Sequence, residues 1–253
     1  MSLEIIPLKS SRFERLNNMF YQVGSRLYNG VMGSPLWKGV FVLGTGTALA
    51  QGIGIISTPI ITRLYSPSDF GLLGVYSSLL TMLTVIASLR YEYAIPISKS
   101  SSKAANILVL CLMITLGITG MLCILFLLAG NRIADMLDLQ APLPYFWLVL
   151  IGLLGSGIYQ ALNHWAIRER DYPRITRTKI NQSLGGSLSK ILFGLLTLGP
   201  LGLIAGHIIS NVAGIYTFTK AIIKKDRDVF RDVSVTGIKS VAREYHSFPA
   251  YSA

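Results

Sequence analysis

Apolar residues in this chain form long continuous runs instead of the spaced pattern of an amphipathic surface helix. Six runs reach about 20 residues, the length that a helix needs to cross the hydrocarbon core of a bilayer. They occupy residues 39–62, 70–89, 104–130, 141–167, 180–198 and 201–219. The pattern predicts an all-α, polytopic transmembrane helix bundle of about six helices.

The distribution of Lys and Arg predicts the orientation of the bundle, because positively charged short loops stay in the cytoplasm. Of the 23 Lys and Arg residues, 20 lie before the first run, after the second, after the fourth and after the last. The opposite connections hold only Arg63 and Arg132, and an uncharged hairpin signal, Gly199-Pro200-Leu201-Gly202, joins the last two runs. Both chain ends are therefore predicted to be cytoplasmic (N-in/C-in).

Three regions follow from this organisation. Residues 1–37 mix apolar and basic side chains and are expected to form a cytoplasmic amphipathic segment on the anionic inner leaflet. Residues 38–223 hold the six-helix transmembrane bundle, and residues 224–253 form a basic cytoplasmic tail that looks like the approach to a further membrane segment.

Composition agrees with a membrane protein. The chain is 51% hydrophobic and 14% charged, against about 25% charged residues in a soluble domain. Its net charge of +11 could suggest nucleic acid, but the basic residues flank apolar runs instead of gathering on a soluble face. The phospholipid bilayer is the expected partner, and no nucleic acid is expected.

Cysteine and histidine spacing gives no sign of a metal site or a cofactor. Cys111 and Cys123 lie twelve residues apart in one helical run, about 18 Å, which is too far for a disulfide. His164, His207 and His246 are scattered, and there is no CxxC pair. We expect no metal and no cofactor.

Polar residues recur at spacings of three and four along four of the runs, so they share helix faces. Such faces either pack against another helix or line a cavity, because they avoid lipid. Small and hydroxylated residues favour packing, whereas for the larger Gln51 and Asn163 the two readings are equally supported. The four faces are Gly44, Thr47, Gln51, Gly54, Thr58 and Thr62; Ser77, Thr81, Thr84 and Ser88; Gly152, Ser156, Tyr159 and Asn163 with Gln160 and His164; and His207, Asn211 and Gly214.

Lys190 is the one cation inside an apolar run. It lies ten residues beyond Ile180 and eight before Leu198, about 15 Å and 12 Å from the ends of that run. An intramembrane charge is a candidate functional residue, here one that attracts an anionic substrate group. The alternatives are a structural ion pair, or a helix boundary that places Lys190 closer to the surface.

Several motifs resemble the opening of known bacterial exporters. The stretch Ile61-Thr62-Arg63-Leu64-Tyr65-Ser66-Pro67-Ser68-Asp69-Phe70-Gly71 joins the first two runs, and Leu89-Arg90-Tyr91-Glu92-Tyr93-Ala94-Ile95 follows the second. Phe248-Pro249-Ala250-Tyr251 lies in the tail. Over residues 38–253 the chain resembles the O-antigen, capsule-precursor and oligosaccharide flippases of the multidrug/oligosaccharidyl-lipid/polysaccharide superfamily.

This resemblance implies a function and a location. Such flippases move an undecaprenyl-pyrophosphate-linked oligosaccharide across the bacterial cytoplasmic (inner) membrane by alternating access, through a cavity with a cationic lining. Lys190 would belong to that lining, Arg63 and Arg90 to its mouths, and Gln51 and Asn163 to the translocation path. Family members have two bundles, so the resemblance implies that this chain is the N-terminal half. It also leaves room for polysaccharide polymerase and assembly proteins as partners.

Other functions are less well supported by the sequence. A cation-coupled small-molecule exporter of the same superfamily would need intramembrane carboxylates, and no Asp or Glu lies well inside a run. An enzyme would need an acid/base constellation, but Glu92, Glu169 and Asp171 stand among Arg residues like solvated loop charges. No catalytic residue is predicted. A non-transporting scaffold subunit of a polysaccharide assembly complex stays open.

Overall fold

A computed structural model describes residues 35–136 and 142–248, and all regular structure in these ranges is helical. Most of the expected amphipathic segment 1–37, and residues 249–253 of the tail, lie outside the described residues. In chain order the elements are α2 (Pro35–Leu64), α3 (Pro67–Ile86), η1 (Tyr91–Tyr93), α4 (Ala94–Ile97), α5 (Ser101–Met136), α6 (Pro142–Arg168), α7 (Tyr172–Leu195), α8 (Gly199–Val212), α9 (Ile215–Ala221), η2 (Ile222–Asp226), η3 (Val229–Asp232) and α10 (Val235–Glu244).

The helices match the apolar runs, which confirms the all-α polytopic bundle. Among the described residues, five segments are long and apolar enough to cross a membrane: Gly39–Leu64, Pro67–Ile86, Ser101–Gly130, Pro144–Arg168 and Gly199–Lys224. The fifth predicted run corresponds to α7, which has 24 residues but begins at Tyr172, in a more polar stretch than the run itself. Helix α7 is thus long enough to span the membrane, but it is too polar to be among the five candidate spans.

A capping box starts α3 and explains the Ser-Pro-x-Asp motif in physical terms. The backbone N–H of Asp69 donates to the Ser66 hydroxyl (3.3 Å), and the backbone N–H of Ser66 donates to the Asp69 carboxylate (2.9 Å). Pro67 fits the first helical turn because its missing N–H is not needed there. The motif therefore fixes the point at which the chain turns back into the bundle.

The predicted hairpin at Gly199-Pro200-Leu201-Gly202 is displaced by three residues. The turn lies at Leu196–Leu198, where Thr197 has a φ of +55°, and α8 already begins at Gly199. Pro200 again lies in the first turn of a helix, where proline is tolerated. The Gly-Pro pair therefore starts a helix instead of forming the turn.

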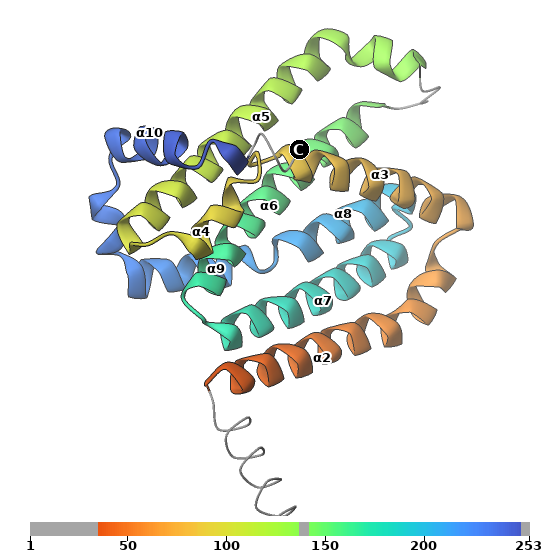
Figure 1. Ribbon diagram of the computed structural model, residues 1–253. Coiled ribbons are helices and arrows are strands. Elements are labelled where there is room, and N and C mark those ends of the chain that lie inside the picture. Colours follow the sequence, from red (N-terminus) through yellow and green to blue (C-terminus); the bar gives the residue numbers. More distant parts are fainter. Residues whose placement is uncertain (1–34, 137–141, 249–253) are drawn as a thin grey trace, which may run out of the picture. The chain divides into compact units, whose positions relative to one another are not determined.

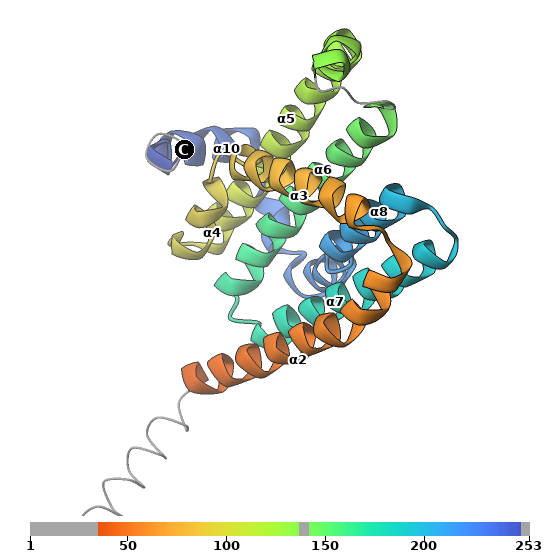
Figure 2. The same cartoon turned by 90° about the vertical axis from the view of Figure 1, so that its right-hand side faces the viewer.

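Helix α7 lies between α2 and α8 (Figures 1 and 2), and its polar side chains bond to both neighbours. The Ser183 hydroxyl donates to the Ala50 carbonyl of α2 (2.5 Å), and the Gln182 amide donates to the Asn211 carbonyl of α8 (3.1 Å). A polar helix can stay inside a membrane bundle only when neighbouring helices satisfy its polar groups. These bonds account for a spanning-length helix with low hydropathy.

Glycines bring α7 and α8 into close contact. A Cβ atom added at Gly186 would lie 2.5 Å from Ser210 Cβ, and one added at Gly206 would lie 2.5 Å from Lys190 Cγ and 3.0 Å from its backbone nitrogen. Contacts this short leave no room for a side chain. Small residues at such crossings are the usual basis of helix association in membranes.

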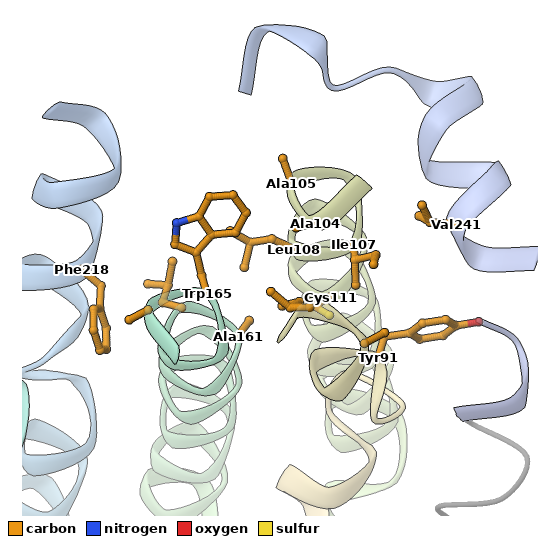
Figure 3. Packing of buried hydrophobic residues seen from close by; sticks show 14 of the residues in the cluster. Tyr91, Ala104, Ala105, Ile107, Leu108, Cys111, Ala161, Trp165, Phe218 and Val241 are labelled. Carbon is orange, nitrogen blue, oxygen red and sulfur yellow. The ribbon is translucent and has the colours of Figure 1, made fainter. Parts of the chain in front are cut away.

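The largest buried cluster lies at the end of the bundle where α5, α6 and α9 meet. Figure 3 shows Trp165 of α6, only 1% exposed, between Phe218 of α9 and Leu108 of α5. The Trp165 indole N–H donates to the buried carboxylate of Asp226 (3.1 Å). This cluster fixes the end of the bundle at which the sequence places most positive charge.

The described part of the predicted tail packs against α5. Val241 of α10 is 2% exposed, the Ser234 N–H donates to the Asn106 side-chain oxygen (3.2 Å), and Lys103 pairs with Glu244 (2.7 Å). The Tyr91 hydroxyl also donates to the Ala242 carbonyl (3.1 Å), and burial raises the pKa of Tyr91, which keeps it a donor. Helix α10 is therefore packed against the transmembrane bundle.

The contact of α7 with α8 predicts the effect of a small substitution. Gly206→Ala should lower the thermal unfolding temperature of the detergent-purified protein, because the new methyl group meets backbone atoms of Lys190 and overpacking costs about 1–3 kcal/mol. Gly120→Ala in α5 is the matched control, since a Cβ there meets nothing within 4 Å. Equal unfolding temperatures for the two variants would contradict this packing.

Candidate functional site: a polar cavity between the helices

A cavity of about 550 Å³ lies between α3, α6, α7 and α8. Of its described lining residues, only Leu80 and Val85 have purely apolar side chains. The polar lining consists of Ser77, Thr81 and Thr84 from α3, Arg90 and Tyr93 from the turn after it, Ser156, Tyr159 and Gln160 from α6, Gln182 from α7, and His207 and Asn211 from α8. A cavity with this lining can hold water or the hydroxyl groups of a solute inside the membrane.

Three of the four polar faces seen in the sequence meet at this cavity. The faces on α3, α6 and α8 each contribute at least two lining residues, whereas the face on α2 contributes none. The packing alternative holds for some positions, because Gly152 and Gly214 are in close contact with Tyr76 and Tyr159. Sequence reasoning missed Gln182 as a lining residue, although a long amide inside an apolar run was a usable signal.

Some polar groups in the walls are paired and others are free. The Tyr159 and Thr178 hydroxyls bond to each other (3.2 Å), which ties α6 to α7. By contrast, the His207 ring nitrogens and the Asn211 side-chain amide bond to no described residue; the His207 ring lies edge-on to Tyr76 at 5.9 Å. The free groups are available to a solute in the cavity.

Arg90 lies in the cavity because of an unusual backbone turn. Leu89 and Arg90 both adopt positive φ angles, +50° and +63°, in the left-handed region that non-glycine residues rarely occupy. Such residues cost about 1–3 kcal/mol each and cluster at functional sites. The turn ends α3 and directs the guanidinium into the polar space.

The Arg90 guanidinium is only partly satisfied. Its Nη1 donates to the Tyr93 hydroxyl (3.0 Å), and its Cζ lies 5.5 Å from the centre of the Tyr93 ring. The Nε is buried and has no hydrogen-bond partner among the described residues. A buried donor without a partner is costly, so this nitrogen favours any rearrangement of the side chain that brings it to a hydrogen-bond acceptor. Of the predicted site residues, Arg90 is the one that lines the cavity.

Glu92 differs from its sequence expectation. Its side chain is 1% exposed and accepts a hydrogen bond from the Ser88 hydroxyl, and no cation of the described chain pairs with it. Glu169 and Asp171 are half-buried and pair with Arg168 (2.9 Å) and Arg174 (2.7 Å). The interpretation of Glu92 as a solvated loop charge was wrong, because η1 packs against α5 and α6 and its Glu92 side chain is buried.

Lys190 lies closer to a helix end than the apolar run suggests. Helix α7 ends at Leu195, five residues beyond Lys190, or about 7.5 Å along the helix. The Tyr65 hydroxyl, in the connection between α2 and α3, donates to the Lys190 carbonyl (2.7 Å). Burial and the Asp69 carboxylate raise the pKa of Tyr65, so this donor stays protonated. Lys190 does not line the cavity, but packs on Gly206 next to the lining residue His207.

The other predicted site residues are not brought to the cavity. Arg63, at the end of α2, and Gln51, in its middle, are both exposed. Asn163 of α6 is half-buried, and its side-chain oxygen has no hydrogen-bond partner among the described residues. Their proposed roles in translocation stay predictions.

Acidic and sulfur ligands do not gather in the described part of the chain. No group of three or more His, Cys, Asp or Glu side chains there could hold a metal ion. Cys111 and Cys123 are both free thiols. The site consists of hydroxyl, amide, imidazole and guanidinium groups.

The apolar helices define a multi-pass membrane protein with a polar cavity in its bundle. The model of one family, described as polysaccharide biosynthesis protein, matches residues 36–242, which include every helix from α3 to η3. The chain belongs to this family. Searches of curated proteins and of solved structures found no match to the chain.

The cavity predicts a difference between two adjacent serines of α3. Ser77 lines the cavity, whereas Ser78 is exposed on the outside of the bundle, where lipid surrounds the helix. Ser77→Cys should react with a water-soluble methanethiosulfonate at least about tenfold faster than Ser78→Cys, because only a thiol in contact with water ionises readily. The unsubstituted chain gives the background rate of Cys111 and Cys123. Equal rates at positions 77 and 78 would show that the cavity is dry.

Proposed function

We propose that this protein exports an undecaprenyl-pyrophosphate-linked oligosaccharide across the bacterial inner membrane for O-antigen, capsule or exopolysaccharide synthesis. The observation that carries the proposal is the polar cavity between apolar helices, with the partly unsatisfied Arg90 in its wall. Membership of the polysaccharide biosynthesis family supports the substrate class. The protein is proposed to be a transporter and not an enzyme.

The cavity chemistry suits the two polar parts of such a substrate. Sugar hydroxyls both donate and accept hydrogen bonds, as do the hydroxyl and amide groups of Ser156, Gln160 and Asn211. A pyrophosphate is anionic, and a guanidinium binds phosphate oxygens with two parallel hydrogen bonds. The polyprenyl chain would remain in lipid, outside the cavity.

The proposed mechanism is alternating access, in which one helix bundle moves against another around a central site. With the predicted N-in/C-in orientation, Arg90 lies at the cytoplasmic end of α3 and would meet the pyrophosphate on entry. Lys190 lies near the C-terminal end of α7, which is the periplasmic end in this orientation. The two cations would then act at different stages of the passage.

Arg90 gives the direct test of this proposal. Introduced into the native gene, Arg90→Gln should reduce the initial rate of surface polysaccharide appearance about ten- to hundredfold, the effect of losing one charged hydrogen-bond donor. Arg90→Lys should retain part of the activity, and Lys99→Gln, an exposed cation outside the cavity, should retain all of it. Membrane abundance of each variant is measured by immunoblot. An Arg90→Gln protein with normal abundance and normal export would remove Arg90 from the proposal.

A second candidate, a cation-coupled small-molecule exporter, is favoured by one observation. Glu92 is a buried carboxylate without a cationic partner in the described chain, and such a group can exchange a proton or a sodium ion. The sequence argument against this candidate was that no Asp or Glu lies well inside an apolar run, and Glu92 lies just beyond the end of the second run. Glu92 therefore makes coupling to a cation compatible with either cargo.

Deletion of the gene separates the two cargoes. Under the proposed function, the deletion strain should lose surface polysaccharide and keep its sensitivity to lipophilic cations such as ethidium, because the cavity wall carries Arg90 and would repel them. Both phenotypes are measured in one strain, and the native gene restores the first. Increased ethidium sensitivity with normal surface polysaccharide would favour the small-molecule exporter.

A further inference from the structure

A second cavity of about 720 Å³ lies away from the first, between the beginning of α7 and the α9–η2 segment. It is lined by four basic side chains, Arg174, Arg177, Lys220 and Lys224, and by a single acidic one, Asp171. The two cavities have no lining residue in common. We propose that this basic pocket binds the phosphate headgroup of an anionic glycerophospholipid, a role that does not depend on the proposed function.

The charges of the basic pocket are mostly uncompensated. Asp171 pairs with Arg174 at 2.7 Å, which neutralises one of the four cations. Arg177, Lys220 and Lys224 are exposed, and none of them pairs with a carboxylate of the described chain. Lys220 only approaches the Tyr216 ring, at 5.8 Å. Because Asp171 is already paired with Arg174, the other three cations have no carboxylate partner among the described residues.

The pocket lies where a lipid headgroup would be. Lys224 is the last residue of the candidate span Gly199–Lys224, so its ammonium marks the level at which hydrocarbon gives way to polar headgroups. Tyr216, 73% exposed, and Ile223, 63% exposed, extend outward from the same segment. An acyl chain could lie along these apolar side chains while its phosphate occupies the pocket.

The types of side chain fit phosphate recognition. Arg177 can bind phosphate oxygens through two parallel hydrogen bonds, and each lysine adds a mobile charge. Basic pockets between transmembrane helices on the cytoplasmic side are typical sites for anionic headgroups. The pocket faces the cytoplasm in the predicted orientation, although the proposal requires only that it faces a headgroup region.

The test measures lipid binding to the purified full chain in detergent by native mass spectrometry. Phosphatidylglycerol, phosphatidylethanolamine and inorganic phosphate are titrated separately. The triple variant Arg177→Gln/Lys220→Gln/Lys224→Gln should bind phosphatidylglycerol at least about tenfold more weakly than the native chain, because each cation near a membrane surface contributes to the attraction. Phosphatidylethanolamine, which has no net charge, should bind both proteins weakly.

A control with the same net charge isolates the pocket. Lys99→Gln/Lys239→Gln/Arg243→Gln removes three exposed cations outside the pocket and should leave phosphatidylglycerol affinity unchanged. Lys220→Gln alone should weaken binding in the same direction as the triple variant, which keeps the test valid if the triple variant is unstable. Equal affinities of the two triple variants would overturn the proposal. Full displacement of the lipid by an equal concentration of inorganic phosphate would also overturn it and indicate a site for free anions.

Discussion

The close packing of α7 against α8 is the constraint on which the polar interior depends. Helix α7 carries Gln182, Ser183 and Lys190, which a bilayer would exclude if they faced lipid. Gly186 and Gly206 let the two backbones approach until Gln182 and Ser210 bond across the gap. A bulkier contact would separate the helices and leave these groups without partners. The glycines thus allow α7 and α8 to approach closely enough for Gln182 and Asn211 to form one wall of the polar cavity.

The turn after α3 is the second determinant of the site. Leu89 and Arg90 hold strained backbone angles, and the residues that follow are anchored on both sides. Tyr91 bonds to α10, and Glu92 is buried with Ser88. Because these contacts fix the turn, the strain can persist and Arg90 stays directed into the cavity with its Nε unpaired. A surface loop without such anchors would relax and turn the guanidinium toward the aqueous phase.

The sequence predicted the elements better than their ends. Long apolar runs are a strong signal, because length and hydrophobicity together are required to cross a bilayer. Helix α7 was harder to delimit, because it extends from Tyr172 to Leu195 and its polar residues are accommodated by hydrogen bonds to α2 and α8 that leave no local pattern. Because the helix ends at Leu195, Lys190 lies closer to the membrane surface than the apolar run indicated. The Gly199-Pro200 pair was misread because the same residues are common in turns and in the first turn of a helix.

Periodicity predicted which faces are polar, but not which of them meet. The faces of α3, α6 and α8 line one cavity, whereas Gln51 on α2 is exposed. Whether two polar faces line the same cavity depends on how each helix is rotated about its axis and which helices it packs against. Both follow from packing over the whole bundle. The burial of Glu92 could not be predicted from the sequence either. It depends on the three-residue turn η1, which is too short to produce a periodic pattern of polar and apolar residues.

The break between α8 and α9 places the two cavities on one continuous segment of chain. Helix α8 lines the polar cavity and α9 lines the basic pocket, with Gly214 between them. Gly214 packs so closely on Tyr159 and Thr178 that a Cβ there would lie 2.5 Å and 2.9 Å from their side chains. The segment is therefore held at the break by the same two residues that join α6 to α7 through a hydrogen bond. A ligand in one cavity can influence the other only if it binds differently to two arrangements of the chain, and the closely packed junction at Gly214 disfavours a second arrangement.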